Sequence, residues 1–411
     1  MAVMNFLNEI ASEYPSAVSF ASGRPAETLF DVEKFLARVP DFVRHLAQQQ
    51  RMSVASAYNL LAQYGRTNGI INDLIASQVA ADEGIQCAAN RVLVTTGCQE
   101  AMELCVTTLC RDKNDVILAR SPTYIGITGV ADLHQVEIVP FSCQEQNVAA
   151  ALEEAVAGAE RRGKRPRALY LVPDFDNPTG EVLSRSTREQ IISFCARKSI
   201  VILEDNPYAL FRYEGANIPR MISLDTQGCV AYLGTYSKTV CPGLRVGFVI
   251  LPQKLFGDPL ASQSLLDELS QAKSFVTCNT SQISQAAVGG VLLAESCSLS
   301  RRITPAIEVY RKNRDTMLNA LARAFCEHGD RVQWNKPEGG FFLTVTLPFR
   351  FKKRETQICA EEYGVIVMPL SFFALIDDQD YRVRLAFSNT TPARIEDGIE
   401  RFSRFVHDRL G

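Results

Sequence analysis

One lysine stands in a run of small and hydroxylated residues, and an arginine follows it seven positions later. The segment reads Thr235-Tyr-Ser-Lys238-Thr-Val-Cys-Pro-Gly-Leu-Arg245-Val-Gly247. A lysine that attacks a carbonyl must first lose its proton, and burial beside another cation lowers the pKa of its ammonium group. The hydroxyls of Thr235 and Ser237 and the guanidinium of Arg245 are donors suited to a phosphate. The segment therefore indicates an amine beside a phosphate-binding group.

An amine of this kind, next to a phosphate, is the chemistry of pyridoxal 5'-phosphate (PLP) held as a Schiff base on Lys238. The other interpretation of Lys238 is an exposed lysine in a loop, as most lysines are. Further residues of matching chemistry are needed to choose between the two.

Two segments add candidate cofactor contacts. Gly97-Cys98-Gln99 follows an expected strand and begins an expected helix, whose free backbone N–H groups attract an anion. Tyr124, in Ser121-Pro-Thr-Tyr124, could lay its ring against a flat heterocycle or could simply fill the core.

Two more segments follow strands and carry polar side chains. Asn177, in Asp174-Phe-Asp-Asn177-Pro-Thr-Gly, could donate to a phenolate oxygen or belong to a plain turn. Asp205 could pair with a protonated ring nitrogen, and Tyr208 three residues later could hold the same phenolate as Asn177. An acidic residue at a strand end can instead be a helix cap.

A guanidinium near the end of the chain could bind the carboxylate of an amino or keto acid. Arg384 lies in the expected strand Arg382-Val-Arg384-Leu-Ala-Phe387. Arg382 shares its face by strand alternation, so periodicity leaves the choice between the two arginines open. A surface ion pair is the other interpretation.

The elements that position these residues are short apolar strands alternating with helical segments. The strands are expected at 91–95, 115–119, 136–140, 168–172, 200–204, 230–234 and 246–250. Continuous apolar runs suit strands buried on both faces of a mainly parallel sheet of seven strands between helices. Ligands bind beyond the carboxyl ends of such strands, which is where the candidate residues lie.

After Pro252 the pattern is mostly helical to about residue 324, and a smaller α+β part follows. That part combines expected strands at 341–347 and 381–387 with a helix near 355–364 and a closing helix. We therefore predict a large PLP-binding domain at 45–290 and a small domain at 291–411. The N-terminal arm, 1–44, is predicted to join the small domain.

The composition of the chain limits the kinds of partner that we expect. The formal net charge of −3 gives no reason to expect nucleic acid, and no apolar run approaches the roughly 20 residues of a membrane helix. Twelve cysteines without a CxxC pair and four isolated histidines favour a reduced, cytoplasmic protein without a metal site.

In this order the segments resemble the class I/II aminotransferase family of fold-type I PLP enzymes. The resemblance runs from Val18-Ser-Phe-Ala-Ser-Gly-Arg-Pro25 to Phe387, and Glu204-Asp-Asn-Pro-Tyr-Ala-Leu-Phe-Arg-Tyr-Glu-Gly215 is most similar to the branch of 2-aminoadipate, kynurenine and aromatic aminotransferases. It implies the aspartate-aminotransferase-like fold and an α-amino acid substrate with an α-keto acid product.

The resemblance also implies a role for each candidate residue. Lys238 would carry the Schiff base and move the proton, Asp205 would pair with the pyridine nitrogen, and Tyr124 would stack on the ring. Asn177 and Tyr208 would hold the phenolate. The phosphate would be bound by Cys98, Gln99, Thr235, Ser237 and Arg245, and by Tyr64 of the partner subunit in a homodimer.

For the substrate, the resemblance implies that Gly23, Asn177 and Arg384 contact the carboxylate. Arg24 stands where the family reads substrate side chains, and a salt bridge elsewhere is the other possibility.

Several positions depart from the family pattern. Asp176 precedes Asn177 where a neutral residue is usual, Leu370 replaces a glycine, and Cys98 replaces a serine or alanine. Arg66-Thr-Asn68 replaces a proline-rich turn. Asp176 and Leu370 motivate a second hypothesis, a specialised PLP enzyme of elimination, replacement, cyclisation or oxidation. A third, a non-catalytic regulatory protein that kept the fold, conflicts with the intact lysine, aspartate and arginine.

Overall fold

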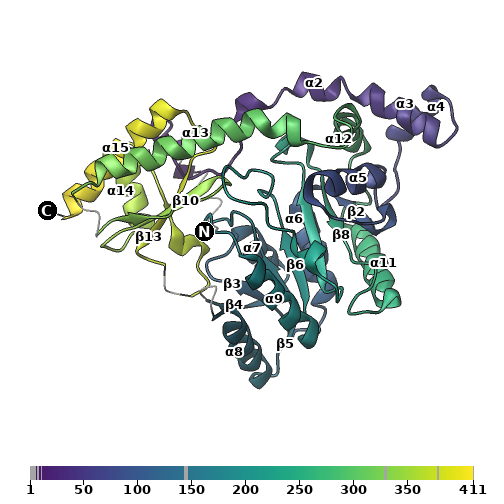
Figure 1. Cartoon of the computed structure of the whole chain (residues 1–411), viewed down its shortest axis with the longest axis horizontal. Helices are drawn as coiled ribbons and strands as arrows, with labels where there is room; N and C mark the ends of the chain where they lie inside the picture. Colours follow the sequence, from purple (N-terminus) through teal and green to yellow (C-terminus); the bar gives the residue numbers. More distant parts are fainter. Residues whose placement is uncertain are drawn as a thin grey trace.

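A seven-stranded sheet forms the centre of the computed structural model, which describes residues 6, 9–10, 12–142, 147–327, 331–376 and 379–410 (Figure 1). Its strand order is β2-β8-β7-β6-β5-β3-β4. The strands are β2 (Val92–Thr95), β3 (Asp115–Arg120), β4 (Glu137–Phe141), β5 (Arg165–Leu171), β6 (Val201–Asp205), β7 (Val230–Thr235) and β8 (Gly247–Ile250). All seven expected strands are therefore confirmed, and their ends differ from the expected ends by three residues at most.

The sheet is mainly parallel, as predicted, with one exception. β8 runs antiparallel to both of its neighbours, β2 and β7. Because β8 is reversed, its first residues lie at the same edge of the sheet as the last residues of the parallel strands. This reversal brings Arg245, which precedes β8, to the edge where Thr235 ends β7.

Helices cover both faces of the sheet, and successive strand residues point into different apolar layers. Val116 and Leu118 pack with α8 (Val148–Arg161) and α9 (Arg185–Lys198), whereas Ile117 packs with α6 (Gly97–Leu109). The layer of Ile117 also includes α7 (Ile125–Leu133) and α11 (Pro259–Val276), and the opposite face is completed by α5 (Asn72–Glu83), α10 (Met221–Leu224) and α12 (Gln282–Ala294). Burial on both faces explains the continuous apolar runs of the sequence.

A second sheet belongs to the C-terminal part of the chain. It has the order β12-β13-β10-β9 and is antiparallel, and its strands are β9 (Gln333–Trp334), β10 (Phe342–Thr346), β12 (Met368–Pro369) and β13 (Arg382–Ala386). Three helices pack around it: α13 (Ser300–Ala324), α14 (Lys353–Tyr363) and α15 (Pro392–Leu410). Figure 1 shows α13 as the long helix that crosses the top of the molecule.

The N-terminal arm joins this C-terminal part through a short parallel pairing. β1 (Val18–Ser19) pairs with β11 (Val365–Ile366). The chain then passes through η1 (Glu27–Leu29) to the helices α2 (Val32–Leu36), α3 (Val39–Gln49) and α4 (Val54–Leu61), which lie at the far side of the large sheet in Figure 1. The domain boundaries at 45 and 291 stay a prediction, and residues 1–5 of the arm lie outside the described residues.

Further short 3-10 helices are η2 (Ala89–Arg91), η4 (Pro242–Leu244) and η5 (Leu370–Phe373). None of the helices in the described part of the chain has both the length and the apolar character needed to cross a membrane.

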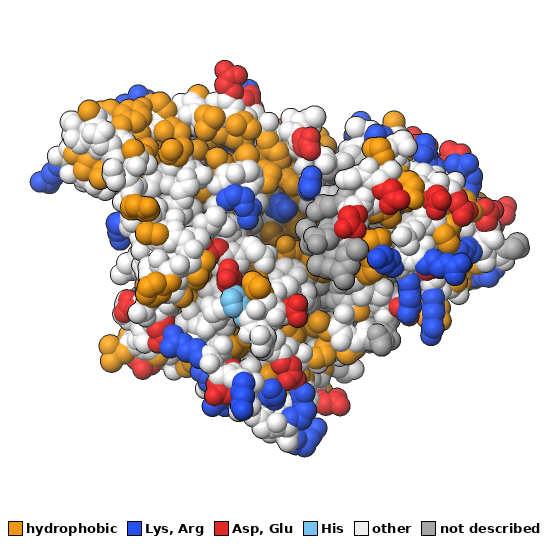
Figure 2. Space-filling view, turned by 180° about the vertical axis from the view of Figure 1, so that it is seen from behind, with side chains coloured by type: hydrophobic (Ala, Val, Ile, Leu, Met, Phe, Trp, Pro, Cys, Tyr) orange, Lys and Arg blue, Asp and Glu red, His pale blue; other side chains and the backbone are white. Residues whose placement is uncertain are grey.

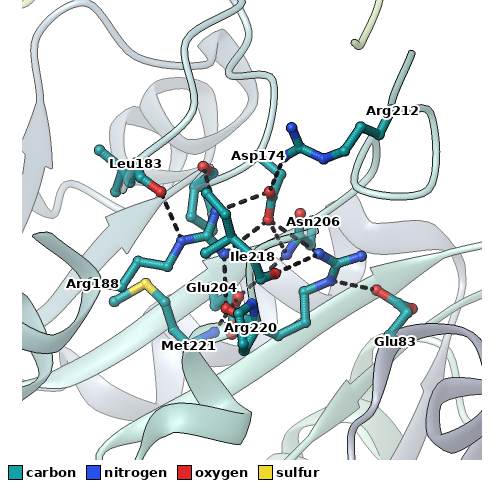
Figure 3. A network of polar contacts seen from close by, with 12 residues as sticks. Glu83, Asp174, Leu183, Arg188, Glu204, Asn206, Arg212, Ile218, Arg220 and Met221 are labelled. Carbon is teal, nitrogen blue, oxygen red and sulfur yellow. Dashed lines mark hydrogen bonds and ion pairs between the residues drawn. The ribbon is translucent and has the colours of Figure 1, made fainter. Parts of the chain in front are cut away.

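A buried polar network holds the ends of β5 and β6 together (Figure 3). Asp174 and Arg188 are both fully buried and form two hydrogen bonds, of 2.9 and 3.0 Å. Arg220 lies 3.5 Å from the same carboxylate and donates to Glu83 at 3.0 Å. Charges removed from water need this kind of dense pairing.

The network reaches the residues that follow the two strands. The Asn206 side chain donates to Asp174 at 3.3 Å and to Glu204 at 3.2 Å, and Glu204 also accepts from the backbone of Met221 and Ile222. Burial raises the pKa of Glu204 to about 7. Asp174 lies three residues before Asn177 and Glu204 directly before Asp205, so the network fixes the backbone that carries two of the predicted site residues.

We expect Arg188→Met to lower the free energy of unfolding by about 3 kcal/mol or more, because it leaves the buried Asp174 carboxylate short of its bidentate partner. The matched control is Arg185→Met on the same helix, whose exposed pair with Glu189 contributes less than about 1 kcal/mol. Urea unfolding followed by circular dichroism measures both. Equal losses in the two variants would contradict a stabilising role for the network.

Candidate active site

A partly enclosed cavity of about 200 Å³ lies beyond the carboxyl ends of β2, β5, β6 and β7. Ten of the residues predicted from the sequence line it: Cys98, Gln99, Tyr124, Asn177, Asp205, Tyr208, Thr235, Ser237, Lys238 and Arg245. Four further lining residues were not predicted: Met102, Val172, Pro207 and Pro242. Strand order brings these segments together although they span about 150 positions of the sequence.

Lys238 is held in a state that favours loss of its proton. Burial lowers the pKa of Lys238 to about 8, and the nearby positive charges of Arg245 and Arg24 lower it too, against the opposing charge of Asp205. Its Nζ lies 5.9 Å from the centre of the Tyr208 ring. Within the described residues no carboxylate forms an ion pair with Lys238. The lysine is therefore an amine ready to act as a nucleophile or base near neutral pH.

One end of the cavity is built for an anion. The α6 helix begins at Gly97, whose φ of 75° lies in the left-handed region, and a Cβ added there would collide with the Arg245 guanidinium. Thr235 donates its hydroxyl to Ser237 at 3.0 Å, and both side chains face the same space. Within the described residues Arg245 has no acidic partner. Helix N–H groups, hydroxyls and an unpaired guanidinium match the chemistry of a phosphate.

Asp205 also lines the cavity and is 3% exposed. Tyr170 donates its hydroxyl to one oxygen at 2.6 Å, and the Cys98 thiol lies 3.3 Å from the other. Burial raises the pKa of Asp205 to about 6, although both donors and the charge of Lys238 act against this rise.

Arg384 is the arginine that the structure buries next to the cavity. Its Nη1 donates to Asn177 Oδ1 at 2.7 Å and its Nη2 to the Ala21 carbonyl. The guanidinium carbon lies 4.4 Å from the Phe342 ring centre and 4.7 Å from that of Phe373. Burial lowers the pKa of Arg384 to about 10.

No carboxylate in the described residues pairs with Arg384, and its Nε is buried without a partner. A buried cation without a counter-charge is a suitable binding site for the carboxylate of a ligand. Arg382, by contrast, is half-buried and donates to Thr344 at 3.1 Å. Burial and pairing therefore separate the two arginines that strand alternation left equivalent.

Besides Arg384, three other predicted residues lie outside the cavity lining: Gly23, Arg24 and Tyr64. A Cβ added at Gly23 would collide with the Phe342 ring, so the glycine lets the arm approach the residue beneath Arg384. Arg24 is exposed, and no carboxylate in the described ranges pairs with it. Tyr64 is 85% exposed on the surface of this single chain.

The residues that depart from the family pattern also have defined places. Asp176 accepts from the Thr179 hydroxyl at 2.8 Å and from its backbone N–H at 3.3 Å, which closes the turn after β5. Burial raises the pKa of Asp176 to about 6. Leu370 is fully buried in a small cluster with Met368 and Phe373. Neither residue lines the cavity.

Among the described residues no group of three or more His, Cys, Asp or Glu side chains could hold a metal ion. His328 and Cys143 lie outside the described residues.

Sequence comparison agrees with this geometry. The sequence profile of "Aminotransferase class I and II" matches residues 28–402. The chain belongs to this aminotransferase family. A curated relative, the (S)-3,5-dihydroxyphenylglycine transaminase of Amycolatopsis orientalis, is 39% identical over 408 residues, which cover 99% of this chain and 92% of the relative.

Solved aminotransferase structures share the fold over nearly the whole chain. The multiple substrate aminotransferase of Thermococcus profundus is 26% identical with a TM-score of 0.84, covering 100% of this chain and 96% of its own. LysN, the alpha-aminoadipate aminotransferase of Thermus thermophilus, is 26% identical with a TM-score of 0.78, covering 98% and 95%. The aminoadipate relationship confirms the predicted branch of the aminotransferases, and both structures confirm the predicted fold.

Besides the four unpredicted lining residues, three residues that contact Asp205 or Arg384 were not predicted from the sequence: Tyr170, Phe342 and Phe373. Each lies in an apolar run, where the sequence indicates only core packing. Tyr170 carried one signal, because a buried tyrosine hydroxyl requires a partner. The partners of Phe342 and Phe373 depend on contacts between distant segments.

In the protein freed of cofactor, we expect acetylation of Lys238 by acetic anhydride to rise with pH around a midpoint near 8. A free lysine side chain titrates near roughly 10.4. Arg245→Gln removes a positive charge and should move the midpoint up, whereas Asp205→Asn removes a negative charge and should move it down. Peptide mass spectrometry follows the reaction. A midpoint as high as that of a free lysine would rule out the desolvated amine.

Proposed function

We propose that this aminotransferase moves an amino group from an α-amino acid to an α-keto acid with PLP held in the cavity around Lys238. One observation carries the proposal: a lysine of lowered pKa shares a single cavity with an unpaired phosphate-type site and a buried aspartate. The LysN structure, solved with N-(5'-phosphopyridoxyl)-L-leucine, supports PLP as the cofactor.

The residues that line the cavity match the phosphate, the ring and the phenolate oxygen of PLP. The phosphate would be held by the N-terminus of α6 at Cys98 and Gln99, and by the cluster of Thr235, Ser237 and Arg245. Asp205 would face the ring nitrogen, Tyr124 would cover the ring, and Asn177 and Tyr208 would hold its phenolate oxygen. When bound, PLP supplies an aldehyde that joins an amine and a ring that accepts electrons from the bonds at that nitrogen.

Lys238 would handle the proton in the reaction. Because burial lowers the pKa of Lys238 to about 8, the fraction of neutral amine near neutral pH is much larger than for a free lysine, and that amine would take a proton from the substrate Cα. Burial of Tyr124 and Tyr208 raises the pKa of both phenols, so both remain uncharged hydrogen-bond donors.

The substrate carboxylate would be seated on Arg384. The guanidinium already lies between two aromatic rings and against Asn177, so little ordering is needed when a carboxylate arrives. Gly23 lies beside the Phe342 ring and would contribute its backbone. Arg24 has no acidic partner among the described residues and stays a candidate for reading the substrate side chain.

A homodimer with shared sites would bring Tyr64 to the phosphate. Figure 2 shows hydrophobic side chains gathered along the edge that carries α3 and α4 in Figure 1. Large exposed apolar residues on α4, α11 and α12 include Tyr58, Leu260, Phe275 and Ile283, with Phe275 83% exposed. Exposed apolar surface of this kind marks an interface. The free cysteines in the described ranges support the predicted reducing, cytoplasmic location.

The hypothesis of a specialised elimination, replacement, cyclisation or oxidation enzyme rested on Asp176 and Leu370, and the positions of these two residues do not support it. Asp176 is committed to the turn that contains Thr179, and Leu370 is packed in a core cluster. Neither residue is placed to direct a different reaction, which leaves amino-group transfer as the function best supported.

We expect sodium borohydride treatment of the PLP-loaded protein to leave a pyridoxyl mass on the peptide that contains Lys238. Lys238→Ala should lose that mass and should also lose transfer of the amino group to a keto acid, by about a thousandfold or more. Lys254→Ala, a lysine outside the cavity, serves as control. A pyridoxyl mass on another lysine would contradict the assignment.

We expect Tyr64→Ala to weaken PLP binding by about tenfold, as loss of a phosphate contact should. Mixed with Lys238→Ala protein and allowed to exchange subunits, it should regain about a quarter of wild-type activity at limiting PLP. The reason is that half of the dimers are mixed and one site in each is then intact. No recovery would show that Tyr64 does not act across the interface.

A further inference from the structure

The carboxylate of Asp205 is held by two side chains that the family resemblance did not assign to it. Tyr170 donates to Oδ2 at 2.6 Å from β5, the strand next to that of Asp205. The Cys98 thiol lies 3.3 Å from Oδ1 at the start of α6. Each oxygen therefore has its own donor, and a carboxylate has further lone pairs free for a third partner in the cavity.

Both donors keep their protons over the whole working pH range. Tyr170 is 1% exposed, and burial raises the pKa of its hydroxyl well above the ordinary value. Burial and the charge of Asp205 likewise raise the pKa of the Cys98 thiol. A group that stays protonated beside a carboxylate stabilises the ionised carboxylate against the neutral acid.

Such stabilisation matters because Asp205 is almost fully buried. Burial alone favours the neutral carboxylic acid, which cannot form an ion pair with a protonated ring. When a carboxylate and a ring nitrogen share one proton, donors to the carboxylate shift that proton towards the nitrogen. The electron-accepting power of a pyridine ring depends on that protonation.

We propose that Tyr170 and Cys98 are positioning residues that keep Asp205 ionised, so that the proton it shares with the cofactor stays on the ring nitrogen. This inference rests on the proposed function, because it requires PLP in the cavity.

Cys98 has two tasks in this arrangement. Its backbone belongs to the N-terminal turn of α6, which would bind the phosphate, while its thiol lies 3.3 Å from the Asp205 carboxylate. One residue thus links the turn that would bind the phosphate to the carboxylate that would face the ring. A serine keeps this donor and an alanine loses it, which separates the thiol's hydrogen bond from its bulk.

The protein reconstituted with PLP carrying ¹⁵N at the ring nitrogen tests the proposal. The ¹⁵N chemical shift reports whether the ring is protonated, with free PLP titrated through its ring nitrogen as the calibration. We expect the wild-type protein to give the protonated position. Tyr170→Phe should move the signal at least halfway to the unprotonated position and lower kcat by about tenfold. Cys98→Ala should move it less, and Cys98→Ser should match the wild type.

The matched control is Tyr232→Phe, which removes a buried tyrosine hydroxyl that donates to Glu83 at 2.6 Å, outside the cavity. Thermal midpoints should fall in both tyrosine variants, but the ¹⁵N signal should move only in Tyr170→Phe. A signal that stays protonated in Tyr170→Phe, or moves equally in Tyr232→Phe, overturns the proposal.

The borohydride experiment separates this inference from the proposed function. If the wild-type protein gains a pyridoxyl mass on Lys238 while the ¹⁵N signals of wild type and Tyr170→Phe coincide, only the role of Tyr170 and Cys98 falls. If no cofactor binds, both the function and the inference fall.

Discussion

The main physical constraint on this structure is that three charged side chains at the cavity are shielded from water without an oppositely charged partner in the described part of the chain. Asp205 and Arg384 are buried and Lys238 is half-buried, and in the described residues none of them has an ion-pair partner. Burial shifts the pKa of all three towards the neutral form. A stable fold tolerates this only if the rest of the structure holds the groups rigidly, and if a ligand completes the charge balance.

The parallel sheet and the polar network supply that rigidity. The residues that follow β5, β6 and β7 lie at one edge of the sheet. Because β8 is antiparallel, Arg245, which precedes it, lies at the same edge. Behind that edge, Asp174 and Arg188 form a fully buried and fully paired counterpart. The two clusters differ in their pairing: the paired charges stabilise the fold, and the unpaired charges are the ones to which we assign ligand binding.

Much of this arrangement was predictable from the sequence because it is local. The seven strands follow from continuous apolar runs, and the residues that line the cavity follow those strands directly. Contacts between distant segments were not predictable. Arg384 and Arg382 share a face and a residue type, and only the Phe342 and Phe373 rings and Asn177 distinguish them. Tyr170 likewise resembles any core tyrosine until its distance to Asp205 is known.

The pairing of β1 with β11 has a consequence for how the chain is made. Val18 and Ser19 find their partners only at Val365 and Ile366, and Phe20 accepts a hydrogen bond from the Ala386 backbone. The ribosome must therefore have synthesised the chain as far as Ile366 before β1 can dock, while the central sheet can already assemble from segments that precede β11. The arm that contains Gly23 and Arg24 is thus translated before the strand it pairs with and can dock only after that strand has been made.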